Sequence, residues 1–346
     1  MNSEWYLAPC ANPDQAAAEL AQQHQSVLTK PPGSLGVLEE IAIRFAAWQG
    51  VAQPQCENIL LRVFAGDHGV CKHGVSAFPQ QVTAQMIHNF IHGGAAISVL
   101  ARRVKADFAV VNAGTVEPID DAPSLHNAQL ANGTADFTEQ AAMTPEVLAA
   151  ALDLGRQQVS SADLFVGGEM GIGNTTAASA IYCALLDISP ESAVGPGTGV
   201  DDDGLERKNQ AIYRALAFHA NKLNNATDVL QRIGGLEIAS LVGAYIASAQ
   251  AGVPVLVDGF ISTAAALVAD EINPGVREWL LFAHESAEPA HTEALKHLHA
   301  QPLLNLGMRL GEGSGAGVAV PLIQTALALH AEMATFVDAG VSEKAS

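Results

Sequence analysis

Two glutamates far apart in the chain are each surrounded by glycines: Glu169 in the segment GGEMGIGNTT and Glu312 in the segment RLGEGSGAG. Glycines allow backbone N–H groups to approach a bound phosphate or ring closely. A carboxylate held among them does not easily find a lysine partner, and it becomes available for proton transfer. Either glutamate alone would be an ordinary solvated loop acid, but two such segments in one chain favour a ligand site.

The residues after the first glutamate predict an anion site at the start of a helix. Gly171, Ile172 and Gly173 come directly before Asn174 and Thr175. Asn and Thr favour the beginning of a helix, where free backbone amides bind phosphate. The alternative is an ordinary capped turn between a strand and a helix. The segment matches neither G-x-G-x-x-G nor a P-loop, so it indicates neither a dinucleotide nor a nucleoside triphosphate.

A second glycine-rich loop, residues 195–210, contains Lys208. Because the chain has few basic residues, a lysine near a glycine-rich loop could be a phosphate partner. Lys208 could equally be a lysine on a helix surface, and the sequence favours neither. Asp201, Asp202 and Asp203 could suggest a metal site. Consecutive acids before a helix usually stabilise its positive end, so we expect them to cap a helix.

Several histidines and cysteines superficially resemble metal ligands. His68, Cys71 and His73 lie close together, but no second cluster has a matching spacing, so we do not expect a metal site. His88 and His92 are four residues apart on an expected helix that lacks the glutamate of H-E-x-x-H. We expect these two to be surface or core histidines.

Apolar residues could form a pocket for a flat aromatic ligand. Phe78 and Met86 occur in the segment SAFPQQVTAQM, and their rings or thioether could sandwich such a ligand, although core packing is the alternative. The apolar surroundings of Glu312 should raise its pKa and make it a better base. No G-x-S-x-G elbow accompanies it, so acyl transfer is not indicated.

Five short apolar runs predict the elements that position these residues. Runs of this kind are typical of strands that are buried on both faces, and alanine-rich helical stretches separate them. The runs end at Ala65, Ala113, Gly168, Gly259 and Glu285. The helical stretches cover residues 83–101, 145–160, 175–187, 205–220, 236–251 and 261–270. The alternation predicts a doubly wound α/β fold with a parallel sheet.

Polar residues follow each of these runs, where ligands bind in open parallel sheets. We therefore expect them to converge on one rim of the sheet. They are Gly66, Asp67 and His68; Asn112 and Gly114; Gly168 and Glu169; Asp258 and Gly259; His284 and Ser286.

Both ends of the chain are expected to be helical, from about residue 14 to residue 28 and from about residue 293 to residue 339. These segments could pack together as a smaller helical domain. The predicted boundaries are 1–55 plus 293–346 for this domain and 56–292 for the α/β domain with the site.

The composition bounds the function. The 346 residues are 49% hydrophobic and only 15% charged, and 17 Lys and Arg against 36 Asp and Glu give a net charge of −19. This charge disfavours binding to nucleic acid or to an anionic membrane. Four cysteines without a C-x-x-C pair suit a reducing compartment. No signal peptide or membrane-spanning run is recognised, so we expect a cytoplasmic protein.

Together the motifs resemble the nicotinate-nucleotide–dimethylbenzimidazole phosphoribosyltransferase (CobT) family. The resemblance covers nearly the whole chain through KPPGSLG, AGDHGV, GEMGIGNTT, VLVDGFISTAAAL, HESAE and MRLGEGSGAG, in this order. It implies a three-layer, Rossmann-like sheet domain, a smaller helical domain and a homodimer. It also implies a pentosyltransferase without metal or cofactor, which moves phosphoribose from nicotinate mononucleotide to 5,6-dimethylbenzimidazole and makes α-ribazole 5′-phosphate for cobamides.

The resemblance also assigns roles to residues. It implies that Glu312 is the general base and that Glu169 is a second site carboxylate, which stabilises the ribosyl centre or assists proton transfer. It places the ribose phosphate and the benzimidazole in separate pockets. The phosphate residues would be the 171–176 loop, Lys208, Gly259, Ser262 and Ser286, and the benzimidazole residues would be Phe78, Met86 and Leu310.

Three alternatives remain open from the sequence. The two glutamates could instead serve a hydrolase of an N-glycoside, as an acid and a water-activating base. The chain could also be a nucleotide-binding protein without catalysis. The apolar Phe78 and Met86, where some members of the family have polar residues, leave adenine and phenols open as acceptors.

Overall fold

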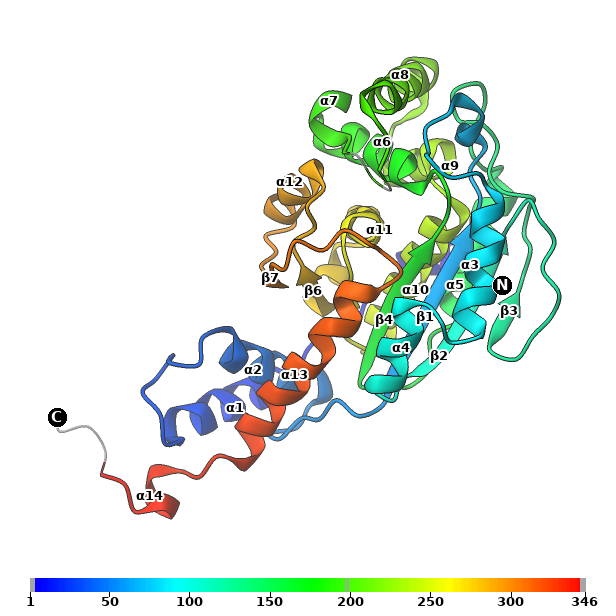
Figure 1. Cartoon of the computed structure of the whole chain (residues 1–346). Helices are drawn as coiled ribbons and strands as arrows, with labels where there is room; N and C mark the ends of the chain where they lie inside the picture. Colours follow the sequence, from blue (N-terminus) through cyan, green and yellow to red (C-terminus); the bar gives the residue numbers. More distant parts are fainter. Residues whose placement is uncertain (1–3, 196, 198, 343–346) are drawn as a thin grey trace.

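A parallel β-sheet forms the centre of the molecule (Figure 1). The structure is a computed structural model that describes residues 4–195, 197 and 199–342. Within these residues the sheet has seven strands in the order β3-β2-β1-β4-β5-β6-β7, all parallel. The strands are β1 (Ile59–Gly66), β2 (Asp107–Gly114), β3 (Leu125–Asn127), β4 (Leu164–Met170), β5 (Val255–Val257), β6 (Leu280–His284) and β7 (Pro302–Leu304).

The strand order confirms the predicted doubly wound α/β fold. The chain leaves β1 toward β2 and β3 on one side, and then returns to β4 and continues to β7 on the other side. The five predicted runs correspond to β1, β2, β4, β5 and β6, and the central strand β1 is buried along its whole length. The sheet therefore has its switch point between β1 and β4, where such folds place ligands.

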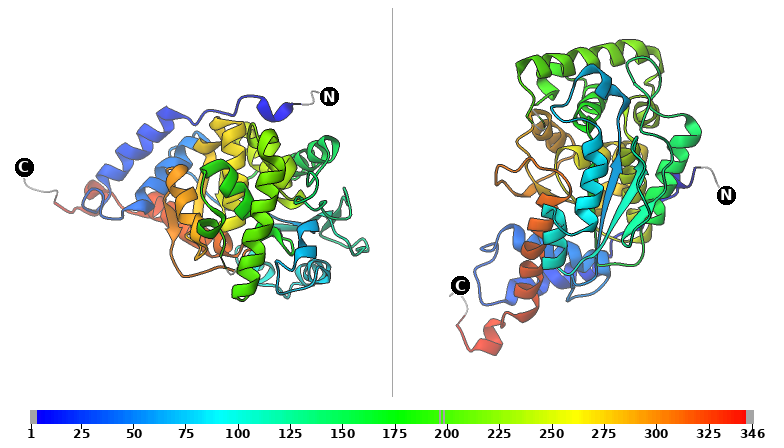
Figure 2. Two further views of the ribbon diagram at one scale, coloured as in Figure 1. Left: turned by 90° about the horizontal axis from the view of Figure 1, so that it is seen from above. Right: turned by 45° about the vertical axis from the view of Figure 1, so that its right-hand side comes forward.

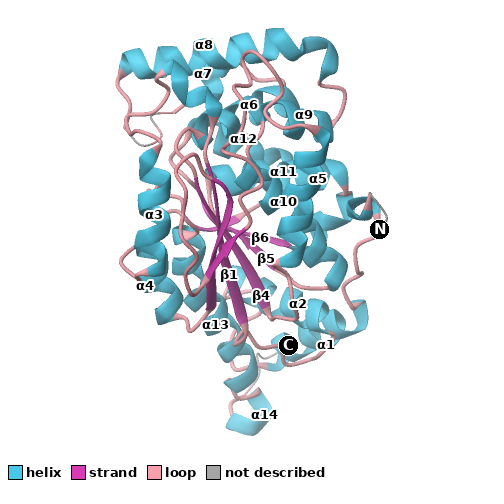
Figure 3. Ribbon diagram, turned by 90° about the vertical axis from the view of Figure 1, so that its right-hand side faces the viewer, coloured by secondary structure: helices cyan, strands magenta, loops and turns pink. Residues whose placement is uncertain are grey.

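Helices cover both faces of the sheet (Figure 3). One face carries α5 (Pro145–Gln157), α10 (Leu236–Ala251) and α11 (Phe260–Ile272). The opposite face carries α3 (Gln81–Ile91), α4 (Ala96–Arg103) and α13 (Ser314–Glu332). Helix α10 is made of small and apolar residues, because it is buried between the sheet, α5 and α11. The three layers agree with the expected architecture.

The predicted single helix over residues 83–101 is wrong in one respect. It is two helices, α3 and α4, which are separated by Gly93 and Gly94. Gly93 has a φ of +79°, a left-handed conformation that ends a helix and that glycine adopts without steric cost.

More helices lie over the carboxyl end of the sheet, with α8 at the end of the molecule opposite α14 (Figures 1 and 3). They are α6 (Asn174–Leu186), α7 (Pro190–Ala193), α8 (Asp202–His219), α9 (Ala226–Ile233) and α12 (Pro289–His297). Short 3-10 helices are η1 (Trp5–Leu7), η2 (Gly69–His73), η3 (Ala220–Lys222) and η4 (Pro274–Trp279). Asp201 caps α8 by accepting a hydrogen bond from Gly204 N at 2.9 Å, which confirms helix capping by this acidic run.

The two ends of the chain meet beyond the amino end of the sheet. Helices α1 (Gln15–Val27) and α2 (Val37–Gln49) pack together, and α2 packs on α13 (Figure 2). Leu28 forms a β-bridge with Thr335, just before α14 (Phe336–Ala339). The division into two domains stays a prediction, and residues 1–3 and 343–346 of the predicted helical domain lie outside the described residues.

The expectation of helix from residue 293 to residue 339 is wrong in its middle. After α12 the chain forms the edge strand β7 and a long loop before α13 begins at Ser314. This loop connects β7 to Glu312 and lies at the carboxyl end of the sheet.

One helix in the described part of the chain is long and apolar enough to cross a membrane by length and composition. This helix is α13, and 56% of its most apolar window is buried inside the protein. It packs against α2, α4 and β6, so its apolar face is covered by protein. A core helix passes the same test, and the finding is weak support for a membrane span.

Candidate active site

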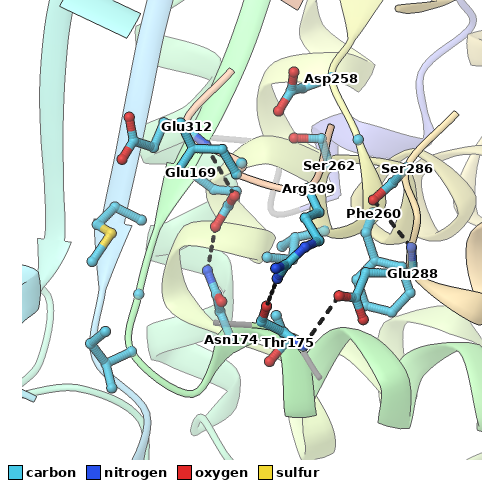
Figure 4. Close-up of a pocket in the computed structure, with 18 of the residues that line it drawn as sticks. Glu169, Asn174, Thr175, Asp258, Phe260, Ser262, Ser286, Glu288, Arg309 and Glu312 are labelled. Carbon is cyan, nitrogen blue, oxygen red and sulfur yellow. Dashed lines mark hydrogen bonds between the residues drawn. The ribbon is translucent and has the colours of Figure 1, made fainter. Parts of the chain in front are cut away.

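A cavity of about 350 Å³ lies at the carboxyl ends of β4, β5 and β6 (Figure 4). All but two of the predicted site residues line it. These are Phe78, Met86, Glu169, Gly171, Ile172, Asn174, Thr175, Gly259, Ser262, Ser286, Leu310 and Glu312. The structure thus brings together residues from distant segments, while the chemical role of each remains a prediction.

The two remaining residues, Gly173 and Lys208, lie directly behind the cavity wall. Gly173 is the N-cap of α6 and has a φ of +95°. Lys208, on α8, is 3% exposed, and its Nζ donates to Thr175 Oγ1 at 3.1 Å and to Gly195 O at 3.2 Å. Two other residues of the predicted 195–210 loop, Pro196 and Thr198, lie outside the described residues.

Glu169 is the sixth residue of β4 and is 4% exposed. One carboxylate oxygen accepts a hydrogen bond from Asn174 Nδ2, and the other accepts one from the backbone N of Glu312 at 3.4 Å. Burial, followed by the nearby charges of Glu237 and Asp258, raises the pKa of Glu169 to about 8. Near neutral pH this carboxyl therefore holds a proton readily.

Glu312 is held in an unusual backbone conformation at the rim of the cavity. Its φ is +65°, and Gly311 and Gly313 beside it have φ values of +84° and +85°. Gly168 lies beneath this turn, and only glycine fits at this position because a Cβ there would collide with the Glu312 carbonyl. A non-glycine residue in the left-handed region is strained, and such residues concentrate at functional sites.

The Glu312 side chain is 7% exposed, and its Oε2 has no hydrogen-bond partner among the described residues. Burial and the charge of Asp258 raise its pKa to about 7. This confirms the expectation of a raised pKa. The carboxylate points away from that of Glu169 (Figure 4). A buried carboxylate with a free oxygen and a pKa near neutrality is suited to accept a proton from a ligand.

Asp258 fixes the loop that carries Glu312. Its carboxylate accepts hydrogen bonds from Ala316 N at 2.8 Å and from Gly313 N at 3.2 Å, so it satisfies the amino end of α13. His284 lies 3.9 Å from Asp258, between the nitrogen Nε2 and the oxygen Oδ1. The strand ends of β5 and β6 therefore position α13, and α13 positions Glu312.

The anion end of the cavity lies at the beginning of α6. The helix begins at Asn174, one residue before the predicted stretch 175–187. Its cap is Gly173, and Asn174 bonds to Glu169 instead of capping the helix. Ile172 is fixed on both sides, since its N donates to Thr83 Oγ1 at 3.1 Å and its O accepts from Cys71 Sγ at 3.0 Å. Free amides at a helix start and a buried lysine behind them suit a phosphate.

Sequence reasoning missed two charged residues at this end. Arg309 lines the cavity, and its Nη1 donates to Gly197 O at 3.0 Å. Glu288 is 6% exposed, and its Oε1 accepts from Gly197 N at 3.2 Å. Two sequence positions could have indicated them: Arg309 lies three residues before Glu312, and Glu288 follows shortly after β6. Arg309 is the cationic side chain among the lining residues, which otherwise include four acids.

The other end of the cavity is apolar. Phe78 and Leu310 are 48% and 58% exposed. Val82 and Met86, which belong to α3, also line the cavity. Exposed apolar side chains at the mouth of a cavity are typical of a site for an apolar ligand. Because Phe78 is largely exposed, core packing does not describe it, whereas Met86 is partly buried and packs against the core as well as lining the cavity.

The predicted rim is only partly correct. Asn112, at the end of β2, binds Asn127 and Gln129 through its Nδ2 and does not line the cavity. The reason is topological, since β1 separates β2 from the cavity side. Asp67 and His68 are fully buried and do not line the cavity, and His68 lies beneath the 171–173 turn.

The histidines and cysteines do not form a metal site in the described part of the chain. His68 binds Glu237, Cys71 binds Ile172 O, and His73 binds Asp136. No group of three or more His, Cys, Asp or Glu side chains that could hold a metal ion occurs among the described residues. His88 and His92 are exposed on or beside α3, as surface histidines.

Comparisons with known proteins agree with this geometry. A model of a phosphoribosyltransferase family matches residues 10–341. A nicotinate-nucleotide–dimethylbenzimidazole phosphoribosyltransferase from Xanthomonas campestris pv. campestris strain 8004 is 55% identical over 99% of this chain and 100% of the relative. The enzyme of the same name from Pseudomonas fluorescens SBW25 is 52% identical over 99% of both chains.

A solved structure is equally similar in fold. The crystal structure of CobT from Thermus thermophilus superposes with a TM-score of 0.91 at 43% identity, and the match covers 95% of this chain and 100% of the other. Similarity of this extent leaves no large segment unmatched. The chain belongs to the nicotinate-nucleotide–dimethylbenzimidazole phosphoribosyltransferase family.

Proposed function

We propose that this chain transfers the 5-phosphoribosyl group from nicotinate mononucleotide to 5,6-dimethylbenzimidazole. The products are α-ribazole 5′-phosphate, nicotinate and a proton. Relatives that match the whole chain are named for this activity. The cavity provides an anion end for the phosphate, an apolar end for the acceptor, and an acid at the rim between them.

The reaction breaks the bond between C1′ of the ribose and the pyridinium nitrogen. The electron pair goes to that nitrogen, so nicotinate leaves as a neutral pyridine ring without acid assistance. One benzimidazole nitrogen forms the new bond to C1′, and the N–H at the other nitrogen becomes acidic. Glu312 accepts this proton, since its Oε2 is free among the described residues and its pKa is about 7.

The nucleotide phosphate binds at the start of α6. Gly171, Ile172, Asn174 and Thr175 line the cavity there, and Lys208 and Arg309 supply positive charge from two sides. Burial lowers the pKa of Lys208, and the charge of Glu288 opposes this shift. Gly259, Ser262 and Ser286 line the wall beside the phosphate.

Glu169 supports the ribose centre. It lies between Asn174, at the anion end, and the backbone of Glu312, at the proton-accepting end. In its ionised form it stabilises positive charge that develops on C1′ in the transition state. Its raised pKa makes the ionised fraction depend on pH in the neutral range.

The observation that carries this proposal is the free oxygen of Glu312 in a cavity that also has an anion site. The test is to measure nicotinate release with and without dimethylbenzimidazole. Transfer predicts that nicotinate forms only with the acceptor, in a 1:1 ratio with α-ribazole 5′-phosphate. Equal release without an acceptor would instead support the hydrolase, and binding of the nucleotide without any product would support a non-catalytic protein.

The acceptor preference needs its own measurement. The wall formed by Phe78, Val82, Met86 and Leu310 is apolar and presents no side-chain hydrogen-bond partner for an exocyclic amine. We therefore expect dimethylbenzimidazole to outcompete adenine when dimethylbenzimidazole, benzimidazole, adenine and p-cresol are present at equal concentration. The product mixture, separated by chromatography, gives the preference directly.

We also propose that the protein is a homodimer and acts in the cytoplasm. The family resemblance supports the dimer, and the exposed apolar residues at the cavity, Phe78 and Leu310, suit a surface that a partner covers. Light scattering after size exclusion measures the mass. A monomer mass at micromolar concentration would contradict this proposal.

A further inference from the structure

Directly beneath the 171–173 turn lie a hydrogen-bonded histidine and glutamate that the proposed reaction does not use. His68, which follows β1, donates through Nε2 to Glu237 Oε1 at 2.8 Å, and Glu237 is in the first turn of α10. Both side chains are completely buried. We call these two residues the buried pair.

The backbone makes room for the buried pair with three glycines from three different elements. A Cβ on Gly171 would collide with Gly66 O, and it would also lie 3.3 Å from His68 Nε2 and 3.4 Å from Glu237 Oε1. A Cβ on Gly66 or Gly235 would lie 3.0 Å or 2.7 Å from Glu237 Oε2. These three glycines therefore allow the backbone to pack closely around this imidazole and this carboxylate.

His68 lies under the whole turn and not only under its first residue. Its Cβ is 3.3 Å from the position that a Cβ on Gly173 would occupy. Its backbone O also accepts a hydrogen bond from Gln80 Nε2 at 2.9 Å, which connects the residue to the beginning of α3. Thr83 and Cys71 also hold the backbone of Ile172 by hydrogen bonds. The His68 side chain therefore packs directly against the 171–173 turn.

Stability alone does not explain a buried histidine and carboxyl group at this place. The loss of hydration of such groups often exceeds the gain from their contact, so apolar residues of similar size would stabilise the fold as well or better. Glu237 Oε2 and His68 Nδ1 have no hydrogen-bond partner among the described residues, which increases this cost. The hydrogen bond instead fixes the imidazole in one orientation.

We propose that His68 and Glu237 are positioning residues, which together hold the 171–173 turn in the conformation that binds the nucleotide phosphate. This inference rests on the proposed function, because it takes the turn as the phosphate site. Neither side chain lines the cavity. The pair acts on the ligand through the backbone of the turn, and dimethylbenzimidazole binds at the opposite end of the cavity.

The test compares His68→Ala, Glu237→Ala, the double variant and Glu237→Gln. We expect each alanine variant to weaken the binding of inorganic phosphate, measured by calorimetry, and to raise KM for nicotinate mononucleotide by at least ~10-fold, as displaced binding groups do. KM for dimethylbenzimidazole should change by less than about twofold, since its pocket is not moved. Glu237→Gln keeps an acceptor for His68 and should remain within about threefold of the wild type.

The double variant shows whether the two residues act together. If they do, it is no worse than either single variant. Additive effects, or equal increases in KM for both substrates, would overturn the proposal. If an alanine variant does not fold, His68→Asn replaces it, because Asn is too short to reach Glu237. Product formation by the wild-type enzyme tests the function separately, and phosphate binding tests the buried pair whatever the reaction is.

A matched control is His330, another fully buried histidine. It lies near the end of α13, its Nδ1 accepts from Gln25 Nε2 of α1 at 2.8 Å, and it does not line the cavity. His330→Ala should lower the thermal stability and leave the ratio of the two KM values unchanged. The same selective loss of phosphate binding in this variant would show that buried histidines act only through general stability.

Discussion

The backbone N–H of Glu312 points at the carboxylate of Glu169, with 3.4 Å between the nitrogen and Oε1. The carboxylate of Glu312 is directed away from this contact (Figure 4). The two glutamates are thus connected from backbone to side chain. This hydrogen bond links Glu169 to the position of Glu312, while Oε2 of Glu312 has no hydrogen-bond partner among the described residues.

Replacing Glu312 by Gln should lower kcat by at least ~100-fold, because a positioned base contributes a factor of this size. The amide has nearly the same shape as the carboxyl group, so the fold should persist. Turnover is measured as α-ribazole 5′-phosphate formed per enzyme, and circular dichroism checks the fold. Activity close to that of the wild type would show that Glu312 is not the base.

The activity should depend on the protonation of Glu312. Its pKa is about 7, and only the ionised form accepts a proton, so kcat should rise with pH up to about pH 7 and then level off. The measurement is a profile of kcat from about pH 5 to pH 9 with saturating substrates. In Glu312→Gln this rise should be absent. A rise that persists in the variant would belong to another group, such as Glu169.

The same group should make stability change in the opposite direction. The pKa of Glu312 is raised from 4.5 in the unfolded chain to about 7 in the folded protein, so the folded state binds the proton more tightly. Its contribution is therefore present below about pH 4.5 and is lost as the pH rises to about 7. Urea unfolding should show that Glu312→Gln gains roughly 2.5 kcal/mol relative to the wild type between pH 5 and pH 8. A constant difference would contradict the raised pKa.

Gly168→Ala should displace Glu312 without removing it. The added Cβ would collide with the Glu312 carbonyl and would lie 2.9 Å from Gly313 N, and neither backbone atom can move freely. We expect kcat to fall by at least ~10-fold, because the base loses its position. The control is Gly167→Ala, whose Cβ meets the side chains of Leu241 and Tyr245 instead. This control should reduce stability more than kcat.

Lys208→Met should raise KM for nicotinate mononucleotide by about 10- to 100-fold, the effect of losing a charge-assisted hydrogen bond. KM for dimethylbenzimidazole should not change, because Lys208 lies behind Thr175 at the anion end. Lys222→Met, at an exposed position, controls for the change in net charge. If both KM values rose equally, Lys208 would be a structural residue and not a phosphate partner.

The central part of the fold could be predicted from the sequence because β1, β4 and β6 are buried on both faces and leave continuous apolar runs. The edge strands β3 and β7 could not, since each has three residues and β7 begins with Pro302. Such short and partly buried strands exist through their neighbours and leave no periodic signal.

The same distinction holds for the site. Glu169 and Glu312 were visible because glycines surround them in the sequence. Arg309 and Glu288 were not, because both contact Gly197, which is far from them in the chain. His68 was compared with metal ligands, although its partner Glu237 lies 169 residues away. Pairing at this distance is decided by the packing of the whole domain.

Helix α13 begins two residues after Glu312 and ends among the terminal helices α1 and α2. Its 19 residues span about 28 Å at 1.5 Å per residue. The far end of α13 is thus anchored on a helix that does not line the cavity. Deleting the first fifty residues would leave every cavity-lining side chain in the sequence. It would nevertheless remove the helix on which α13 packs, and α13 determines where the proton acceptor lies.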